Sequence, residues 1–214
     1  MTPLRIDYIA DVVCPWCWLG WRRLRKALAL RPEVDAIVLW RAYQLDPTLP
    51  EEGADRAAYM AAKFPDAERR RAMGEALAAE AARDGAVLNN DRITRSPNTN
   101  AVHRVIRWAQ AEGRGPEAVE AAFAAYFTEG LDLGDPLVLS ELGAAAGLDP
   151  TRVLDALSRE VDKQAVAAES AFARNEGVSS VPFMIFDGRL SVMGAQPPER
   201  LVRVIDTALS ESAG

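Results

Sequence analysis

The segment Cys14-Pro15-Trp16-Cys17 constrains the fold of this chain more than any other, because it stands where a strand passes into a helix. Residues 4–10 form an alternating run of β-forming residues that predicts a strand. From Cys14 onward apolar side chains recur at helical spacing, and Pro15 suits the first helical turn, where a missing N–H loses no partner. The sequence therefore predicts that both cysteines lie at the N-terminal end of a helix, one turn apart.

These two cysteines are the only ones among 214 residues, and a Cys-x-x-Cys pair is typical of a redox-active dithiol or of half a zinc site. A closed structural zinc site needs four N or S ligands, which Cys14, Cys17 and the single histidine, His103, do not supply within one chain. We therefore expect no metal and no bound cofactor. The alternatives are a zinc site shared across a dimer, or an inert pair of buried apolar side chains.

Composition excludes several classes of function. The net charge of −6 argues against a general nucleic-acid binder, because phosphate neutralisation requires clustered Lys and Arg. The N-terminus lacks a basic region followed by a long apolar run, and no stretch approaches the roughly 18 apolar residues that a membrane span needs. We therefore expect a cytoplasmic protein with no membrane partner. Cytosolic thiols are kept reduced, which favours a catalytic over an architectural role for the cysteines.

Strand and helix signals divide the chain into three parts. Residues 1–49 hold the strand 4–10, the helix after Cys14 and a second strand from Ala36 to Leu45, which together form a βαβ unit with parallel strands. The middle of the chain is rich in Ala, Glu and Arg, lacks strand-like runs and predicts helices that begin at capping residues or prolines: 55–63, 66–84, 98–112, 116–128, 136–146 and 150–158.

Strand signals return near the C-terminus. A helix over 161–176 precedes strands at 183–186 and 190–193, which an Asp-Gly turn joins, and a last helix begins at Pro197. A βαβ start and a ββα end around a helical segment is the element order of the thioredoxin fold. We therefore expect an α/β protein in which residues 1–49 and 159–214 form a discontinuous thioredoxin-like domain and residues 50–158 an inserted helical subdomain.

Several motifs refine this expectation. Besides Cys-Pro-Trp-Cys, they are Trp40-Arg41-Ala42-Tyr43-Gln44-Leu45-Asp46-Pro47, Ser96-Pro97-Asn98-Thr99-Asn100-Ala101-Val102-His103-Arg104, and Gly177-Val178-Ser179-Ser180-Val181-Pro182 with Gly194-Ala195-Gln196. With the helical insertion, these motifs resemble the DsbA family of the thioredoxin superfamily, and within it the FrnE-like group, over nearly the whole chain. The resemblance implies a thiol–disulfide oxidoreductase or isomerase.

The resemblance assigns roles to the four residues of the Cys-x-x-Cys segment. Cys14 is the expected nucleophile, because a helix N-terminus favours a thiolate. Cys17 is the expected resolving thiol, which attacks the mixed disulfide formed at Cys14. Pro15 and Trp16 tune the site. A histidine of DsbA stands where this chain has Trp16, which carries no titratable group, so we expect a less oxidising couple than in DsbA.

Four further residues are candidate parts of the site. Pro182 resembles the cis-proline that faces the cysteines in this superfamily, and the backbone of Val181 is then expected to pair with an extended peptide or with glutathione. Asn98 is expected to cap a helix or to line the substrate cleft. His103 either faces the cleft as a proton shuttle or caps or pairs within the helical subdomain. Two other aromatic residues are expected in the core: Trp18 and Trp21.

Two alternative functions remain open. The first is a glutathione-dependent isomerase or transferase of the 2-hydroxychromene-2-carboxylate isomerase or kappa-class type, although those relatives usually carry serine where Cys14 stands. The second is a chaperone-like binding module with little turnover. Expected partners are protein or small-molecule thiols and disulfides, with glutathione as a candidate redox co-substrate, and the expected assembly is a monomer or a homodimer.

Overall fold

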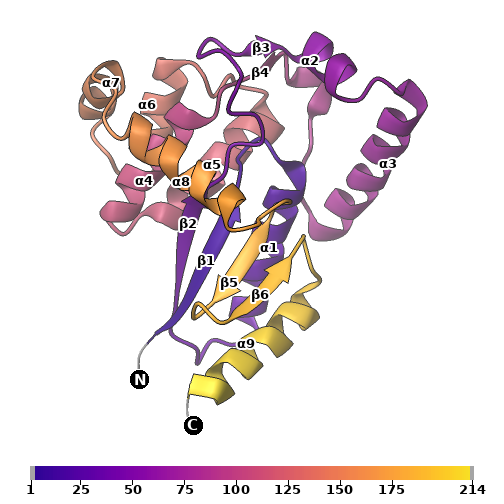
Figure 1. Ribbon diagram of the computed structural model, residues 1–214, viewed down its shortest axis with the longest axis vertical. Coiled ribbons are helices and arrows are strands. Elements are labelled where there is room, and N and C mark those ends of the chain that lie inside the picture. Colours follow the sequence, from indigo (N-terminus) through magenta and orange to yellow (C-terminus); the bar gives the residue numbers. More distant parts are fainter. Residues whose placement is uncertain (1–2, 213–214) are drawn as a thin grey trace.

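The computed structural model of the chain describes residues 3–212 and is built on a four-stranded sheet in the order β2-β1-β5-β6 (Figure 1). The strands are β1 (Leu4–Ala10), β2 (Ala36–Ala42), β5 (Phe183–Phe186) and β6 (Leu190–Met193). β1 and β2 are parallel, and β5 and β6 are each antiparallel to their neighbours. A parallel pair needs a crossover connection, which α1 (Pro15–Ala29) supplies, so the predicted βαβ unit is confirmed.

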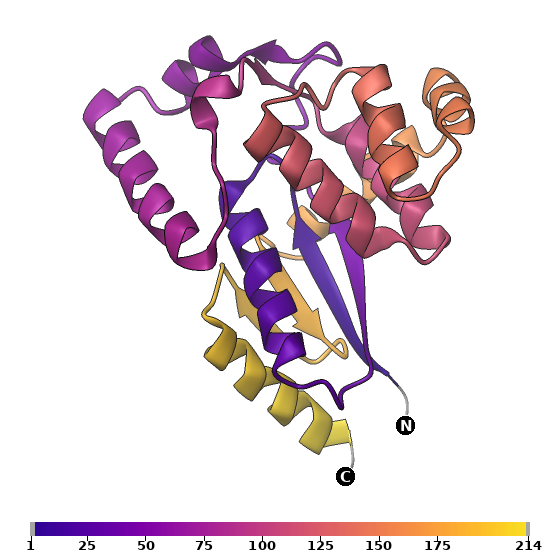
Figure 2. The ribbon, with the colours of Figure 1, turned by 180° about the vertical axis from the view of Figure 1, so that it is seen from behind.

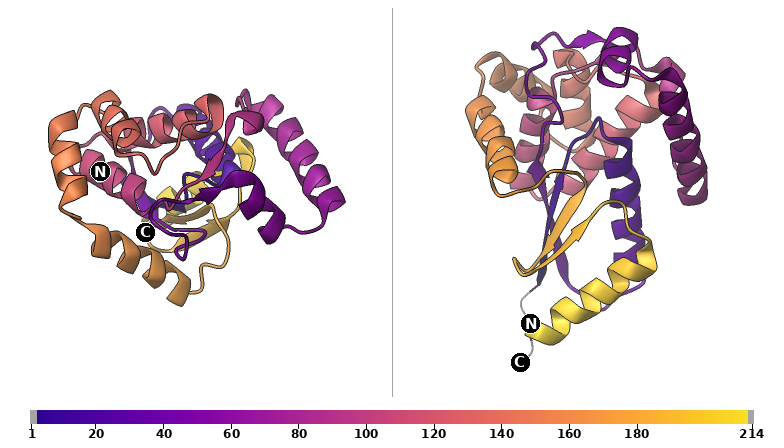
Figure 3. Two further views of the ribbon diagram at one scale, coloured as in Figure 1. Left: turned by 90° about the horizontal axis from the view of Figure 1, so that it is seen from above. Right: turned by 45° about the vertical axis from the view of Figure 1, so that its right-hand side comes forward.

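Helices cover both faces of this sheet. α1 and α9 (Pro198–Ser212) pack together on one face, which is turned toward the viewer in Figure 2. α8 (Lys163–Asn175) lies on the opposite side, as the right-hand view of Figure 3 shows. Nearly every side chain of β1 is buried, as expected for an inner strand between two helical layers. The expected α/β thioredoxin-like fold is therefore confirmed.

Between β2 and α8 the chain is mainly helical and gathers beyond one end of the sheet, in the upper part of Figure 1. The helices are α2 (Arg56–Lys63), α3 (Ala67–Asp84), α4 (Asn100–Ala111), α5 (Gly115–Phe123), α6 (Pro136–Ala145) and α7 (Pro150–Ser158). As predicted, aspartate side chains accept backbone N–H groups at the start of α3, α6 and α7. The same arrangement at Asp55 begins α2.

The structure differs from the sequence prediction in the middle of the chain. A two-stranded ladder, β3 (Ala54–Asp55) with β4 (Arg95–Ser96), stands where no strand was predicted. Strands this short are invisible to a pattern that needs several alternating residues. The predicted helix 116–128 is α5 followed by a π-helix, η2 (Ala124–Glu129), and a short 3₁₀ helix, η1 (Asn90–Arg92), precedes β4.

The predicted second strand also ends early, at Ala42 rather than Leu45. The Tyr43 amide still donates to the Ala10 carbonyl of β1 at 3.0 Å. The two amides that follow leave the ladder, because Gln44 N donates to Ser170 Oγ at 2.8 Å and Leu45 N donates to Asp11 Oδ2 at 2.7 Å. Side chains from distant segments thus turn the chain away from the sheet, which a local pattern does not reveal.

An aromatic cluster joins the sheet to the helical segment. Trp18 on α1 stacks on Phe123 and Phe127, with ring centroids 6.1 and 5.5 Å apart. Trp40 on β2 contacts Phe123 edge-on, at 5.9 Å. Trp18 and Trp21 are 4% and 2% exposed, so their predicted core positions are confirmed.

The buried Arg23 of α1 binds the end of α3, where Arg22 and Lys26 of α1 also donate to Asp84. Arg23 Nε donates to Asp84 Oδ2 at 2.6 Å, and other guanidinium nitrogens donate to Glu80 and to the carbonyl of Ala195. The side chains of Arg23 and Asp84 are 9% and 8% exposed, whereas most of α3 is exposed. The attachment of α3 therefore depends on this ion-pair cluster.

Across residues 3–212, none of the helices is both long and apolar enough to span a bilayer.

Candidate active site

The two cysteines lie where β1 leads into α1, at the carboxyl end of the inner strand. Cys14 is the N-cap residue of α1, and its own N–H donates to the Asp11 carbonyl at 3.1 Å. The N–H of Cys17 donates to Cys14 Sγ at 3.3 Å. The sulfur therefore takes the position of a capping acceptor at the positive end of the helix, where negative charge is favoured.

The segment before β5 forms the wall that faces Cys14. Cys14 Sγ lies 3.9 Å from the Val181 carbonyl, and the Val181–Pro182 peptide bond is cis. The antiparallel pairing of β5 with β1 brings this segment to the end of β1. The Pro182 carbonyl accepts the N–H of Gly194 at 2.8 Å, which ties the segment to the loop after β6.

The two cysteines differ in their surroundings. Cys14 is 6% exposed and Cys17 is completely buried. Burial raises the pKa of Cys17 well above its ordinary value, and the hydrogen bond and charge of Cys14 raise it further. The Asp11 backbone lowers the pKa of Cys17, whereas the Asp11 charge raises it. Cys17 is therefore held as a thiol at neutral pH.

This difference predicts selective alkylation. With iodoacetamide at pH 7, the native reduced protein is expected to take up one label, on Cys14, because the reagent requires an accessible thiolate and Cys17 offers neither. Mass spectrometry of peptides before and after unfolding in guanidinium measures the sites. Labelling of both cysteines at similar rates in the native protein would contradict this view of Cys17.

Gly20, one turn after Cys17, lets the helix approach the facing wall. A Cβ at this position would lie 2.7 Å from both Pro182 Cγ and the Tyr8 hydroxyl oxygen. That hydroxyl donates to the Cys17 carbonyl at 2.6 Å, so the same close contact holds α1 against β1. Glycine is thus required here for packing.

Gly20→Ala is expected to lower the free energy of unfolding by about 1–3 kcal/mol, because it overpacks a tight contact. Turnover in a disulfide-exchange assay is expected to fall by about 10- to 100-fold, because the Pro182 wall shifts relative to Cys14. The matched control is Gly74→Ala on α3, where nothing lies within 4 Å of the new Cβ. Urea denaturation and initial rates on both variants measure the difference, and equal behaviour would refute the packing argument.

Trp16 projects outward beside the cysteines. It is 39% exposed, and Pro15 occupies the first helical position as expected. Its indole contributes an apolar surface next to Cys14 and no titratable group.

His103 lies in neither of its expected positions. It is 1% exposed, so it does not face a cleft, and its partners lie outside the helical segment. Its Nδ1 accepts the Trp40 indole N–H at 3.0 Å, and its Nε2 lies 3.2 Å from Asp11 Oδ1. α4 carries the ring inward, so His103 bridges β2 and the turn before Cys14.

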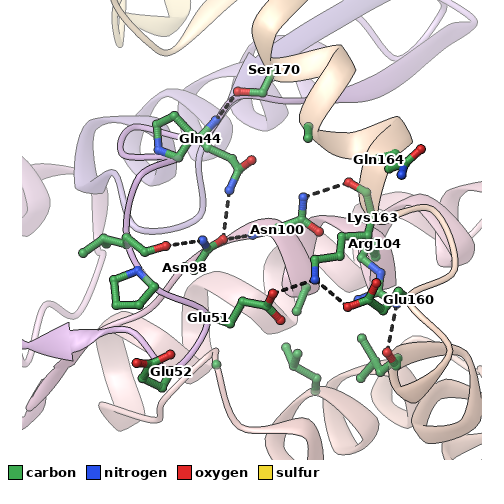
Figure 4. A pocket seen from close by; sticks show the side chains of 18 of the residues that line it. Gln44, Glu51, Glu52, Asn98, Asn100, Arg104, Glu160, Lys163, Gln164 and Ser170 are labelled. Atoms are coloured by element: carbon green, nitrogen blue, oxygen red, sulfur yellow. Dashed lines mark hydrogen bonds and ion pairs between the residues drawn. The ribbon is translucent and has the colours of Figure 1, made fainter.

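Asn98 lines a groove together with residues of the loop 44–52 and of α8 (Figure 4). Its Oδ1 accepts N–H groups from Gln44 and Asn100, and its Nδ2 donates to the Leu49 carbonyl. α4 therefore begins at Asn100, two residues later than predicted. The groove measures about 1380 Å³ but neither cysteine nor Pro182 lines it, so the structure does not bring Asn98 to Cys14.

Two cationic side chains of this groove are bound to groups of the protein itself. Lys163 bridges Glu51 and Glu160, each at 2.6 Å, and Arg104 donates to the carbonyls of Ala156, Leu157 and Val161. In the described part of the chain, no group of three or more His, Cys, Asp or Glu residues is placed to hold a metal ion.

Sequence reasoning missed three residues around the cysteines: Tyr8, Asp11 and Gly20. Asp11 is fully buried at the end of β1, and Tyr8 is fully buried within it. The sequence does contain a signal for Asp11: it is a polar residue at the carboxyl end of a buried strand, just before the Cys-x-x-Cys segment, where site residues are common. Tyr8 carried no such signal, because an aromatic residue suits an inner strand in any case.

The fold and the cysteine pair together define a thioredoxin-type protein with a dithiol at the start of its first helix. The chain belongs to the family of the DSBA-like thioredoxin domain, whose model matches residues 5–206. This is a family of thiol–disulfide oxidoreductases.

Solved structures agree with this membership. A probable DsbA oxidoreductase of Streptomyces coelicolor is 30% identical, with a TM-score of 0.86 and coverage of 97% of this chain and 91% of that chain. Two others share the fold at lower identity. The cytosolic disulfide reductase DsbM of Pseudomonas aeruginosa with GSH is 20% identical (TM-score 0.65, coverage 96% and 99%). A 2-hydroxychromene-2-carboxylate isomerase is 17% identical (TM-score 0.67, coverage 98% and 96%).

Proposed function

We propose that this protein is a cytosolic thiol–disulfide oxidoreductase or isomerase of the FrnE-like group, with Cys14 as nucleophile and Cys17 as resolving thiol. The observation that supports it most is the position of Cys14 Sγ, between the Cys17 N–H at 3.3 Å and the Val181 carbonyl at 3.9 Å. A thiolate there is stabilised by the helix N-terminus and stands beside a backbone segment suited to holding an extended substrate.

In the first step the Cys14 thiolate attacks one sulfur of a substrate disulfide. A mixed disulfide forms at Cys14, and the other substrate sulfur leaves as a thiolate. Val181 holds the substrate backbone during this step, and Trp16 supplies an apolar contact for its side chains. Substrates of this kind are protein disulfides or small disulfides such as oxidised glutathione.

In the second step Cys17 loses its proton and attacks Cys14 Sγ. The Cys14–Cys17 bond forms, and the bond from Cys14 to the substrate breaks with the electron pair leaving on the substrate sulfur. Two molecules of reduced glutathione, which become one glutathione disulfide, or one molecule of a dithiol then return the enzyme to its reduced form. Run in reverse, the same steps oxidise a substrate dithiol.

Two assays on the purified protein test this proposal: reduction of insulin and reactivation of scrambled ribonuclease, both in a glutathione buffer. We expect catalysis in at least one of them, at rates well above the buffer alone. Absence of catalysis in both, with a correctly folded protein, would refute the proposal.

A glutathione-dependent isomerase is the second candidate, supported by the fold shared with the 2-hydroxychromene-2-carboxylate isomerase. The pair of cysteines favours dithiol exchange over a glutathione-dependent isomerisation, because Cys17 is placed to resolve a mixed disulfide at Cys14. Ring rearrangement of 2-hydroxychromene-2-carboxylate with glutathione, measured beside insulin reduction, separates them. A chaperone-like module would instead suppress aggregation of unfolded protein equally well without Cys14.

A further inference from the structure

The segment before β5 is held at its two ends and is open between them. Val178 N donates to the Ala173 carbonyl of α8 at 3.0 Å, and the Pro182 carbonyl accepts the Gly194 N–H at 2.8 Å. Within the part of the chain that the structure describes, residues 179–181 make no backbone hydrogen bond of their own. The position of these residues therefore depends on what fixes the two ends.

Tyr43 spans from the central sheet to the first of these ends. Its backbone N–H donates to the Ala10 carbonyl at the end of β1 at 3.0 Å, and its hydroxyl donates to the Val178 carbonyl at 3.2 Å. The side chain is 6% exposed and belongs to a small apolar cluster with Ile9 and Val178. A phenol ring is rigid and has few side-chain torsions. Tyr43 thus sets the distance between the strand that leads to Cys14 and the segment that faces it.

Arg174 on α8 holds the Tyr43 ring in its orientation. The guanidinium carbon lies 4.2 Å from the centre of the ring, in a cation–π contact. The same guanidinium donates to the Gln44 carbonyl, and to Ser170 Oγ at 3.0 Å. Ser170 Oγ also accepts the Gln44 N–H at 2.8 Å, so α8 is joined to the residue that follows Tyr43. The ring therefore has a fixed neighbour over its face as well as partners at its two ends.

The Tyr43 hydroxyl does something that apolar packing alone does not explain. A phenylalanine ring would fill the same cluster, but it would leave the Val178 carbonyl without a donor. Val178 is 7% exposed, and within residues 3–212 the Tyr43 hydroxyl is the one hydrogen-bond partner of its carbonyl. A buried carbonyl that loses its partner is costly, so the chain shifts to satisfy it. Such a shift would move the open residues 179–181.

Building on the proposed function, in which the Val181 backbone holds the substrate, we propose that Tyr43 and Arg174 are positioning residues for polypeptide substrates. This pair, the Tyr43–Arg174 clamp, keeps Val181 where an extended polypeptide can pair with it while its disulfide lies at Cys14. A small disulfide without a peptide backbone needs only the Cys14 thiolate. The clamp therefore raises the affinity for polypeptide disulfides and leaves the intrinsic reactivity of Cys14 unchanged.

Two probes with the same leaving group test this in stopped-flow experiments on the reduced protein. The first is 5,5′-dithiobis(2-nitrobenzoate), which has no peptide backbone. The second is a short cysteine peptide joined by a disulfide to 2-nitro-5-thiobenzoate. In both reactions the Cys14 thiolate forms a mixed disulfide, and 2-nitro-5-thiobenzoate leaves with the electron pair of the broken S–S bond. The first release of colour, measured against peptide concentration, gives a half-saturation concentration and a limiting rate.

For Tyr43→Phe we expect the half-saturation concentration of the peptide to rise about 5- to 10-fold, as for loss of one hydrogen bond to a buried carbonyl. The limiting rate and the reaction with the small disulfide should stay within about twofold of the wild type, because the surroundings of the Cys14 thiolate are unchanged. Arg174→Gln should shift the half-saturation concentration in the same direction. The double variant should exceed the weaker-binding single variant by no more than about twofold, because both side chains act through one contact.

Tyr126→Phe is the matched control. It also removes a buried tyrosine hydroxyl that donates to a backbone carbonyl, that of Arg95 at 3.3 Å, but this carbonyl belongs to β4 and not to the segment before β5. We expect it to leave the reactions with both probes unchanged. A rise in the half-saturation concentration of the peptide as large as that of Tyr43→Phe would show that any lost buried hydroxyl has this effect, and would overturn the proposal.

The other outcomes also decide. A Tyr43→Phe protein with the half-saturation concentration of the wild type overturns the proposal, and so does an equal loss of rate with both probes, because Tyr43 would then only support the fold. If Tyr43→Phe does not fold, Arg174→Gln decides by the same two criteria. A wild-type reaction with the peptide that does not saturate overturns the proposal, since no substrate backbone is then held. Absence of reaction of the wild type with both probes would instead refute the proposed function itself.

Discussion

Replacing Cys14 by serine is expected to abolish insulin reduction and ribonuclease reactivation, leaving only the rate of the glutathione buffer. The hydroxyl is a far weaker nucleophile than a thiolate at neutral pH, and Cys14 stands where the helix start and the Val181 carbonyl converge. The fold is expected to be retained, because serine caps a helix well. Turnover assays and circular dichroism on the same sample measure both effects.

Cys17→Ser is the matched control for this loss. We expect it to keep the first step and to accumulate a mixed disulfide at Cys14 with glutathione or with insulin, which non-reducing electrophoresis and mass spectrometry detect. A Cys14→Ser protein with substantial remaining turnover, or a Cys17→Ser protein that resolves its mixed disulfide as fast as the wild type, would contradict the assigned order of the cysteines.

The second large effect concerns stability. Arg23→Ala is expected to lower the free energy of unfolding by about 3 kcal/mol, because the buried Asp84 carboxylate then keeps only the half-exposed Lys26, at 3.4 Å, as a cationic partner. It also removes the hydrogen bonds of this side chain to Glu80 on α3 and to the Ala195 carbonyl. Urea denaturation followed by tryptophan fluorescence measures the loss.

Arg71→Ala is the matched control, because it removes an arginine–carboxylate ion pair on the exposed side of α3. The side chains of Arg71 and Glu75 are 72% and 73% exposed, so solvent screens this ion pair, and we expect no measurable change in the free energy of unfolding. If the two variants unfold at the same urea concentration, the burial of Arg23 does not matter and the described attachment of α3 is wrong.

Most of the fold could be predicted from the sequence, because its elements carry strong local signals. The strand before Cys14, the proline at the first turn of α1 and the Asp-Gly turn between β5 and β6 each need only their neighbours to be recognised. Asp187 and Gly188 both have positive φ, as the two central residues of a type I′ hairpin turn require. The ladder β3–β4 and the π-helix η2 carried no such signal, because two residues show no alternation and a π-helix has no distinctive local sequence.

The site was predictable in part. The cysteines and the segment at Pro182 stand out as motifs, although the chain separates them by most of its length. His103 was noticed but placed wrongly, because its partners, Trp40 and Asp11, come from β2 and from the end of β1. Asn98 was expected to cap a helix or line the substrate cleft. Its Oδ1 accepts the N–H of Asn100, the first residue of α4, and its side chain also binds Gln44 and Leu49 of the loop 44–52. Contacts between distant segments decide both cases, and no spacing in the sequence encodes them.

Cys14 and Cys17 are expected to form a reversible dithiol–disulfide couple, which a redox titration in glutathione buffers measures. The fraction of Cys14–Cys17 disulfide is measured by mass spectrometry after acid quenching. We predict a single two-electron transition at a potential clearly more negative than the roughly −120 mV of DsbA, toward the −270 mV of thioredoxin, because Trp16 offers no charge to a Cys14 thiolate. A potential as high as that of DsbA would contradict the role given to Trp16, and the absence of any reversible Cys14–Cys17 disulfide would contradict the account as a whole.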